Sequence, residues 1–116
     1  EGWLVGRVVA VEDHAATVRT LYHPEMRVSV LVASSRELGV LQGGTFPVLW
    51  LKYVSRERPP VVNEEVLTSG LSEFYPKGIP VGRVCVVERG REEFFVQVGV
   101  RPYIGSVRIE EVLVGR

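Results

Sequence analysis

The sequence predicts an all-β protein, because its apolar residues occur in short β-branched runs and nowhere at helical spacing over ten or more positions. Glycine, proline, aspartate and asparagine interrupt these runs at intervals of roughly 8 to 12 residues. Closed barrels are the economical arrangement for many short antiparallel strands, since closure leaves no unpaired strand edge. Glycines that interrupt strand patterns are typical of bulges and barrel corners, and these are Gly6, Gly39, Gly82 and Gly99.

Five strands are expected in the first half of the chain. The alternation of apolar and polar residues is strictest over residues 27–32, where Val28, Val30 and Val32 share one face. A half-buried strand requires this spacing, because successive side chains point to opposite faces of a sheet. The other four expected strands are residues 4–11, 16–21, 38–41 and 46–53.

A polar connector separates this half from the next one. Residues 55–60 show no buried pattern and end in Pro59 and Pro60, which stiffen an extended segment. We therefore expect one subdomain in residues 1–58 and a second in residues 59–116. The second half is short for an independent fold, so the halves are expected to share an interface or exchange a strand. Its expected strands are residues 65–68, 79–87, 94–100, 106–109 and 111–114.

A set of apolar residues is predicted to be buried, because each lies on an apolar face or in a continuous apolar run. The set is Val28, Val30, Ile79, Val81, Val84, Val86 and Val112.

The charge balance and the residue types exclude several functions. Fourteen basic residues are matched by fourteen acidic ones, so the chain has no positive field for a nucleic-acid backbone. Cys85 lies in an apolar run and is interpreted as a small core residue. His14, His23 and Cys85 are far apart in the sequence, so no metal site and no cofactor are expected.

A serine hydrolase remains an alternative on residue types alone. Ser69 is accompanied by His14, His23 and Asp13, the chain's only aspartate. Ser69 lacks the flanking glycines of a nucleophile elbow, however, and both histidines lie in expected turns. A serine and a glycine after a strand are more typical of a turn, so we expect no catalytic residue.

The residues Phe74, Tyr75 and Pro76 are the candidate partner-binding residues. They lie in an expected polar loop, where two aromatic rings are unusual and are typical of protein contacts. The alternative is that the rings cap the open end of a barrel.

The sequence resembles a known family over nearly its whole length. Residues 66–71 read V-L-T-S-G-L and residues 74–84 read F-Y-P-K-G-I-P-V-G-R-V, a long and specific match to the rod shape-determining protein MreC family. Residues 6–9, 24–32 and 110–114 are similar to other strands of that family. The chain departs from the family pattern in two turns, at residues 62–64 and 72–73.

The resemblance implies two six-stranded antiparallel β-barrels packed together, one of them chymotrypsin-like in topology but without catalytic residues. It also implies a non-catalytic scaffold for cell-wall elongation that lies outside the cytoplasmic membrane. The expected partners are the class B penicillin-binding transpeptidase, MreD, RodA, MreB and further copies of the protein. No run here has the roughly 20 apolar residues of a spanning helix, so the membrane anchor is expected upstream of Glu1. A small-molecule or oligosaccharide-binding barrel is the third alternative.

Overall fold

The computed structural model describes residues 2–72, 74–90, 94–105 and 109–115. These residues form nine strands and no helix, as the periodicity predicts. The strands are β1 (Gly6–Val11), β2 (Ala15–Thr20), β3 (Arg27–Val32), β4 (Leu38–Gln42), β5 (Leu49–Ser55), β6 (Glu65–Thr68), β7 (Pro80–Glu88), β8 (Phe95–Pro102) and β9 (Glu111–Gly115).

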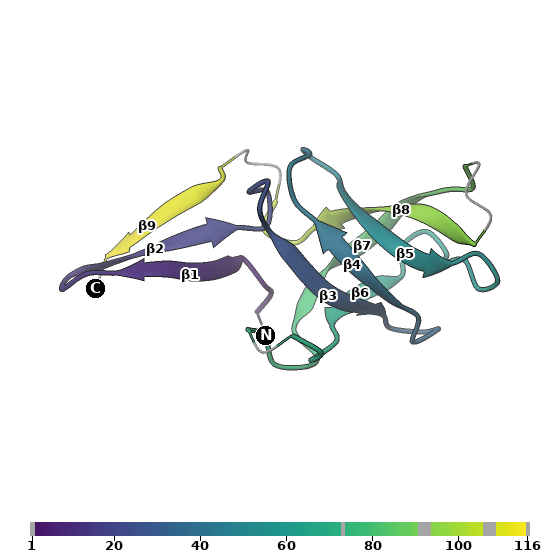
Figure 1. The fold of residues 1–116 in the computed structure, drawn as a ribbon, viewed down its shortest axis with the longest axis horizontal. Coiled ribbons are helices and arrows are strands. Elements are labelled where there is room, and N and C mark those ends of the chain that lie inside the picture. Colours follow the sequence, from purple (N-terminus) through teal and green to yellow (C-terminus); the bar gives the residue numbers. More distant parts are fainter. Residues whose placement is uncertain (1, 73, 91–93, 106–108, 116) are drawn as a thin grey trace.

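Two sheets make up the molecule. Six strands close a barrel in the order β3-β4-β5-β8-β7-β6, and the other three form a sheet in the order β1-β2-β9. Figure 1 shows this three-stranded sheet extending away from one end of the barrel, so the molecule is elongated, with dimensions of 49 × 24 × 22 Å. One six-stranded barrel is thus present, while the described residues of the second sheet do not close.

The sheets do not divide the chain at residue 58. Strands from both sides of the polar connector form the barrel, because β3, β4 and β5 pair with β6, β7 and β8. Likewise, β9 from the end of the chain pairs with β2 from its beginning. The connector at residues 55–60 is therefore a loop between two barrel strands, and the two sheets mix residues of both expected subdomains.

The core fills the inside of the barrel. Inward residues alternate along the strands, and those with almost no exposed surface include Val30, Leu51, Val66, Val81 and Val98. Among the residues predicted to be buried, Val28, Val30, Val81 and Val84 are buried. Ile79 and Val86 are half-buried, and Ile79 packs against this core.

Val112 is the exception among the predicted core residues. Its side chain is 36% exposed, so the prediction of burial is wrong for the described chain. Val112 does lie on an apolar sheet face, opposite Val18 of β2. That face belongs to the three-stranded sheet, and none of the buried core residues comes from β9.

Strand positions agree closely with the sequence pattern, with two differences. The fifth strand begins at Leu49 rather than at Phe46, because Pro47 has no amide hydrogen and Val48 accepts a hydrogen bond from the Thr45 hydroxyl. The strand expected at residues 106–109 lies largely outside the described residues.

Gly6 marks a close approach of two backbones. It pairs with Thr20 across β1 and β2, and a Cβ atom placed on Gly6 would lie 1.8 Å from the carbonyl oxygen of Arg19. A backbone carbonyl in a paired strand has little freedom to move aside. Only glycine therefore fits at the start of β1.

Thr68 closes the loop between β6 and β7. Its buried hydroxyl donates a hydrogen bond to the Pro76 carbonyl at 2.6 Å and accepts one from the Ile79 amide at 2.8 Å. Its backbone amide and carbonyl are bonded to Ile79 and Gly78. Thr68 thus fixes the end of the loop that precedes β7. Valine has the same shape but no hydroxyl group, so it makes neither of these side-chain hydrogen bonds.

We expect Gly6→Ala to destabilise the protein by about 1–3 kcal/mol, the usual cost of overpacking. The added methyl group pushes β1 away from β2, so amide hydrogen exchange should accelerate in both strands. Gly90→Ala is the matched control, because a Cβ atom at Gly90 meets nothing within 4 Å. Equal melting temperatures for the two variants would contradict the close approach.

Thr68→Val should lower the free energy of unfolding by about 1–3 kcal/mol, because two part-buried hydrogen bonds of its hydroxyl, to the Pro76 carbonyl and from the Ile79 amide, are lost. The effect should appear in chemical denaturation and as faster exchange of the Ile79 amide. Thr17→Val on the half-buried strand β2 serves as the control, with an expected change within about 0.5 kcal/mol.

Candidate partner-binding surfaces

The predicted contact residues lie in the loop that Thr68 closes. Phe74 is 52% exposed, and the guanidinium carbon of Arg7 lies 3.6 Å from the centroid of its ring. This is a cation–π contact between the three-stranded sheet and the barrel loop. Phe74 therefore presents part of its ring to solvent at the junction of the two sheets.

Tyr75 has a different environment from Phe74. Its side chain is only 7% exposed and belongs to the hydrophobic core. Burial raises the pKa of the Tyr75 hydroxyl above its usual value, and the positive charge of Arg7 partly opposes this shift. Tyr75 is thus a core residue, whereas Phe74 and Pro76 are exposed.

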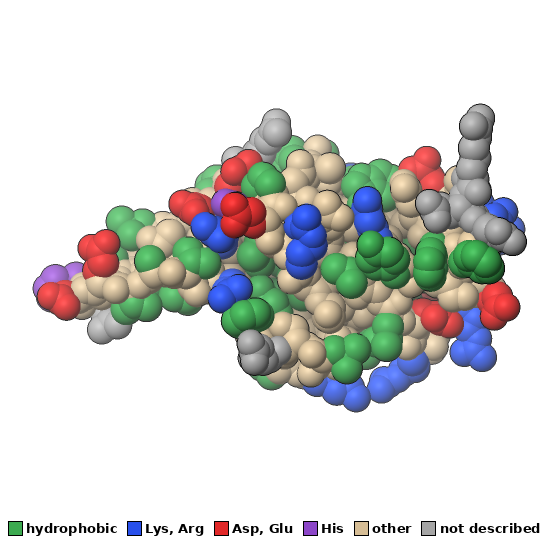
Figure 2. Space-filling view, viewed as in Figure 1, with side chains coloured by type: hydrophobic (Ala, Val, Ile, Leu, Met, Phe, Trp, Pro, Cys, Tyr) green, Lys and Arg blue, Asp and Glu red, His purple; other side chains and the backbone are tan. Residues whose placement is uncertain are grey.

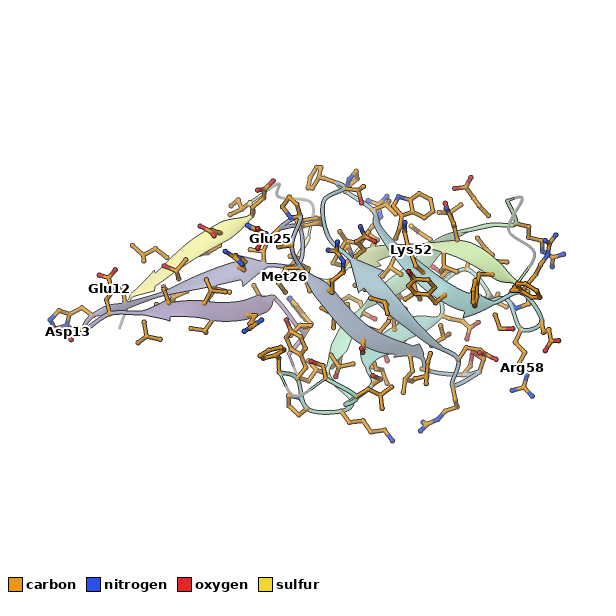
Figure 3. All side chains as sticks on the ribbon, in the orientation of Figure 1. Glu12, Asp13, Glu25, Met26, Lys52 and Arg58 are labelled. Carbon is orange, nitrogen blue, oxygen red and sulfur yellow. The ribbon has the colours of Figure 1, made fainter. Side chains whose placement is uncertain are left out.

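Ser69 is a turn residue in this structure. Its hydroxyl accepts a hydrogen bond from the Leu71 amide at 3.2 Å, and its own amide donates to the Ser29 carbonyl. Gly70 follows with a φ of 78°, a conformation that favours glycine. The His23 ring nitrogen accepts a hydrogen bond from the Glu25 amide. Asp13 lies at the tip of the three-stranded sheet (Figure 3), and His14 follows it in the turn between β1 and β2.

One face of the three-stranded sheet is apolar except for Thr20, which lies at the end of β2 opposite Gly6. Two cross-strand rows form this face, namely Val8, Val18 and Val112, followed by Val11, Ala16 and Val114. The opposite face carries a polar row made by Arg7, Arg19 and Glu111, and beside it a mixed row of Ala10, Thr17 and Leu113. Such alternation is typical of a sheet that covers a core on one side, yet all the valines of β1 and β9 are exposed.

Several contacts fix the sheet to the barrel. The Leu4 amide donates to the Pro80 carbonyl at 2.8 Å, and the Tyr22 hydroxyl donates to the Gly105 carbonyl at 2.7 Å. The Leu21 amide, directly after β2, donates to the Val5 carbonyl, directly before β1, at 3.0 Å. The apolar face and Phe74 therefore keep a defined position relative to each other.

A further surface, absent from the sequence-based predictions, lies on the outside of β5 and β8. Trp50, Lys52 and Tyr53 of β5 point outward beside Phe95 and Gln97 of β8. Figure 2 shows hydrophobic side chains in a row over this part of the barrel, with basic side chains next to them. In the sequence, the alternation of Leu49 and Leu51 with Trp50 and Lys52 indicates that Trp50 and Lys52 share the outer face of the strand.

A bulge gives this surface its shape. The pairing of β5 with β8 shifts between Leu51 and Val54, and Tyr53 has a φ of 69°. The sequence pattern placed Tyr53 on the face of Leu51, and the bulge turns it outward instead. Its ring meets that of Phe95 edge to face at 5.7 Å.

None of the described residues forms a helix that is long and apolar enough to cross a membrane. Within the same residues there is also no group of three histidine, cysteine or carboxylate side chains arranged to hold a metal ion.

Comparison with solved structures gives clear likenesses. A structure named MreC has 26% identity and a TM-score of 0.82, with 97% of this chain and 64% of that chain covered. MreC from Pseudomonas aeruginosa has 27% identity and a TM-score of 0.84, with 99% and 75% covered. This chain therefore spans about two thirds to three quarters of those structures.

A chain of the complex between the penicillin-binding protein PBP2 and MreC from Helicobacter pylori is similar in fold. It has 17% identity and a TM-score of 0.63, with 97% of this chain and 94% of that chain covered. No curated protein matches the sequence. The family model described as "Rod shape-determining protein MreC, barrel core" matches residues 1–116. The chain therefore belongs to the MreC family of rod shape-determining proteins.

Proposed function

We propose that this domain is a non-catalytic scaffold that determines rod cell shape by binding and organising proteins of peptidoglycan synthesis. The observation that carries the proposal is the family match over the whole chain. It is supported by the exposed apolar residues of a chain with zero net charge, because such a chain gains affinity mainly from apolar contacts. The domain works outside the cytoplasmic membrane, and a transmembrane helix elsewhere in the protein anchors it.

The first partner we propose is the elongation-specific penicillin-binding transpeptidase. The fold is shared with a chain of the PBP2 and MreC complex, and this supports the choice. RodA, MreD, MreB and further copies of the protein complete the proposed assembly. Ser69 has a structural role in this proposal, because its hydroxyl is engaged with the Leu71 amide.

Phe74 is the proposed contact in this binding. Its ring is half exposed and is held from one side by Arg7, so little conformational freedom is lost when a partner covers the other side. Exposed aromatic rings commonly contribute most of the energy of protein interfaces. The adjacent Pro76 extends the same surface.

We also propose that the three-stranded sheet is part of a second barrel, which further strands complete. Among the described residues, β1 and β9 each pair on one side only, and the apolar face between them is uncovered. The solved MreC structures contain more chain than is present in this sequence. Strands added at these two edges bury the valine rows and remove both open edges.

Phe74→Ala should weaken binding to the extracytoplasmic part of the transpeptidase by tenfold or more, with a melting temperature close to that of the original protein. The reason is the loss of an interface ring that fills a pocket of the partner. Titration calorimetry or surface plasmon resonance measures the change. Val62→Ala is the control, because Val62 has a similar exposure of 51%.

Arg7→Gln shows, in the same binding experiment, whether Phe74 touches the partner directly or only holds the junction between the two sheets. This variant keeps the Phe74 ring but removes the cation beside it, so affinity should change by less than threefold if Phe74 itself meets the partner. An equal loss in both variants would assign the effect to the junction between the sheets. Unchanged binding in Phe74→Ala would remove the loop from the interface.

The second barrel is tested by hydrogen exchange in the complete extracytoplasmic part of the protein. Amides of β1 and β9 should exchange at least tenfold more slowly there than in residues 1–116 alone, because the new strands accept or donate hydrogen bonds at both edges. Amides of the barrel strand β8 provide the internal reference, since β8 is paired on both sides already. Equal exchange of β1 and β9 in the two proteins would contradict closure.

A further inference from the structure

The outer face of β5 and β8 contains two adjoining hollows. The first has a volume of about 150 Å³ and is lined by Trp50, Gln42 and Thr45 among others. The second has about 180 Å³ and is lined by Tyr53, Phe95 and Val96. Lys52 and Gln97 line both, so the hollows form one continuous shallow groove. We call it the β5–β8 groove.

Two aromatic rings, those of Tyr53 and Phe95, line this groove, and Tyr53 has an unfavourable backbone conformation. Tyr53 adopts a left-handed conformation that a bulky residue seldom takes, and yet its side chain is 63% exposed. The bulge lets both Leu51 and Val54 point into the core, and it leaves Tyr53 on the outer face beside Phe95. Tyr53 and Phe95 stand nearly perpendicular, at 87°, and thus form a corner with two flat walls.

The polar side chains of the groove are of a particular kind. Gln42 is paired with Trp50 across β4 and β5, and Gln97 lies next to the bulge. An amide side chain both donates and accepts hydrogen bonds, which matches hydroxyl and acetamido groups. A proline-rich peptide in polyproline conformation has few amide hydrogens and offers mainly carbonyl acceptors. It therefore uses only the donor half of a glutamine side chain.

The charge of the groove further restricts its ligand. Among the described residues that line the two hollows, Lys52 is the one charged side chain, and Figure 3 shows it on the outer face of the barrel. A polyanion such as nucleic acid requires several cations. A glycan that carries an occasional carboxylate group requires only one cationic side chain.

From these observations we infer that the β5–β8 groove binds an extended glycan of N-acetylated amino sugars, as found in cell-wall strands. Sugar rings present apolar C–H faces that pack on Trp50 and Tyr53, while their acetamido and hydroxyl groups bond to Gln42 and Gln97. Outer faces of other small barrels bind oligosaccharides in a comparable way. The site is separate from Phe74 and goes beyond the proposed protein contacts, because it joins the scaffold to the polymer itself.

The test is a nuclear magnetic resonance titration of the isotope-labelled chain with a tetramer of N-acetylglucosamine. Saturable shifts are expected at the Trp50 indole, at the side-chain amides of Gln42 and Gln97, and along β5 and β8. A glucose tetramer of the same length should bind at least fivefold more weakly, because it lacks acetamido groups. Soluble strands from digested peptidoglycan should shift the same signals.

Two variants locate the site. Tyr53→Ala and Gln97→Ala should each weaken binding of the acetylated tetramer at least fivefold, and Val61→Ala, with a similar exposure of 65%, should leave it unchanged. Circular dichroism melting of each variant shows that the fold is kept. If Tyr53→Ala unfolds the chain, the affinity of Gln97→Ala for the acetylated tetramer decides whether the groove is the binding site.

Three results would overturn the inference. They are the absence of saturable shifts, shifts away from the groove, and binding of a proline-rich peptide there in preference to the glycan. Failure here is distinguishable from failure of the scaffold proposal, because transpeptidase binding is measured separately with Phe74→Ala. A chain that binds the transpeptidase but no glycan keeps the scaffold function and loses only this site.

Discussion

The pairing of β3 with β6 is the constraint on which the rest of the structure depends. It joins the two halves of the chain, with Val30 opposite Thr68 and Val32 opposite Val66, and it closes the barrel. Closure puts the inward valines and leucines of the six strands around one core. It also places Thr68 where its hydroxyl fixes the end of the following loop, and so sets the position of Phe74.

The pleat of the strands explains what the sequence could reveal. Residues 27–32 and 65–68 were predicted with their observed bounds, because alternating side chains and local turns determine a strand without knowledge of its partners. The choice of partners is a long-range property. For that reason the sequence suggested an exchange of strands between the two halves, but it did not show which strands pair, and both sheets combine strands from before and after residue 58.

The candidate surfaces were predictable to different degrees. Phe74 and Tyr75 were both proposed as contacts because aromatic rings in a polar segment are unusual, but nothing local shows that the fold exposes Phe74 and buries Tyr75. Tyr53 was missed for another reason. A bulge without glycine reverses the direction of one side chain, and a period of two residues cannot show such a reversal.

The sheet order also has a consequence for the time course of folding. All barrel strands lie within residues 27–102, whereas the ion pair of Arg19 with Glu111 joins residues 92 positions apart. Contacts between distant residues form late, because the entropy of closing a long loop must be overcome first. Just outside the barrel, the Tyr22 hydroxyl donates a hydrogen bond to the Gly105 carbonyl, so the segments that lead to β2 and β9 leave the barrel next to each other. The barrel thus brings the two end segments of the chain close together, which shortens the loop that must close before β2 pairs with β9.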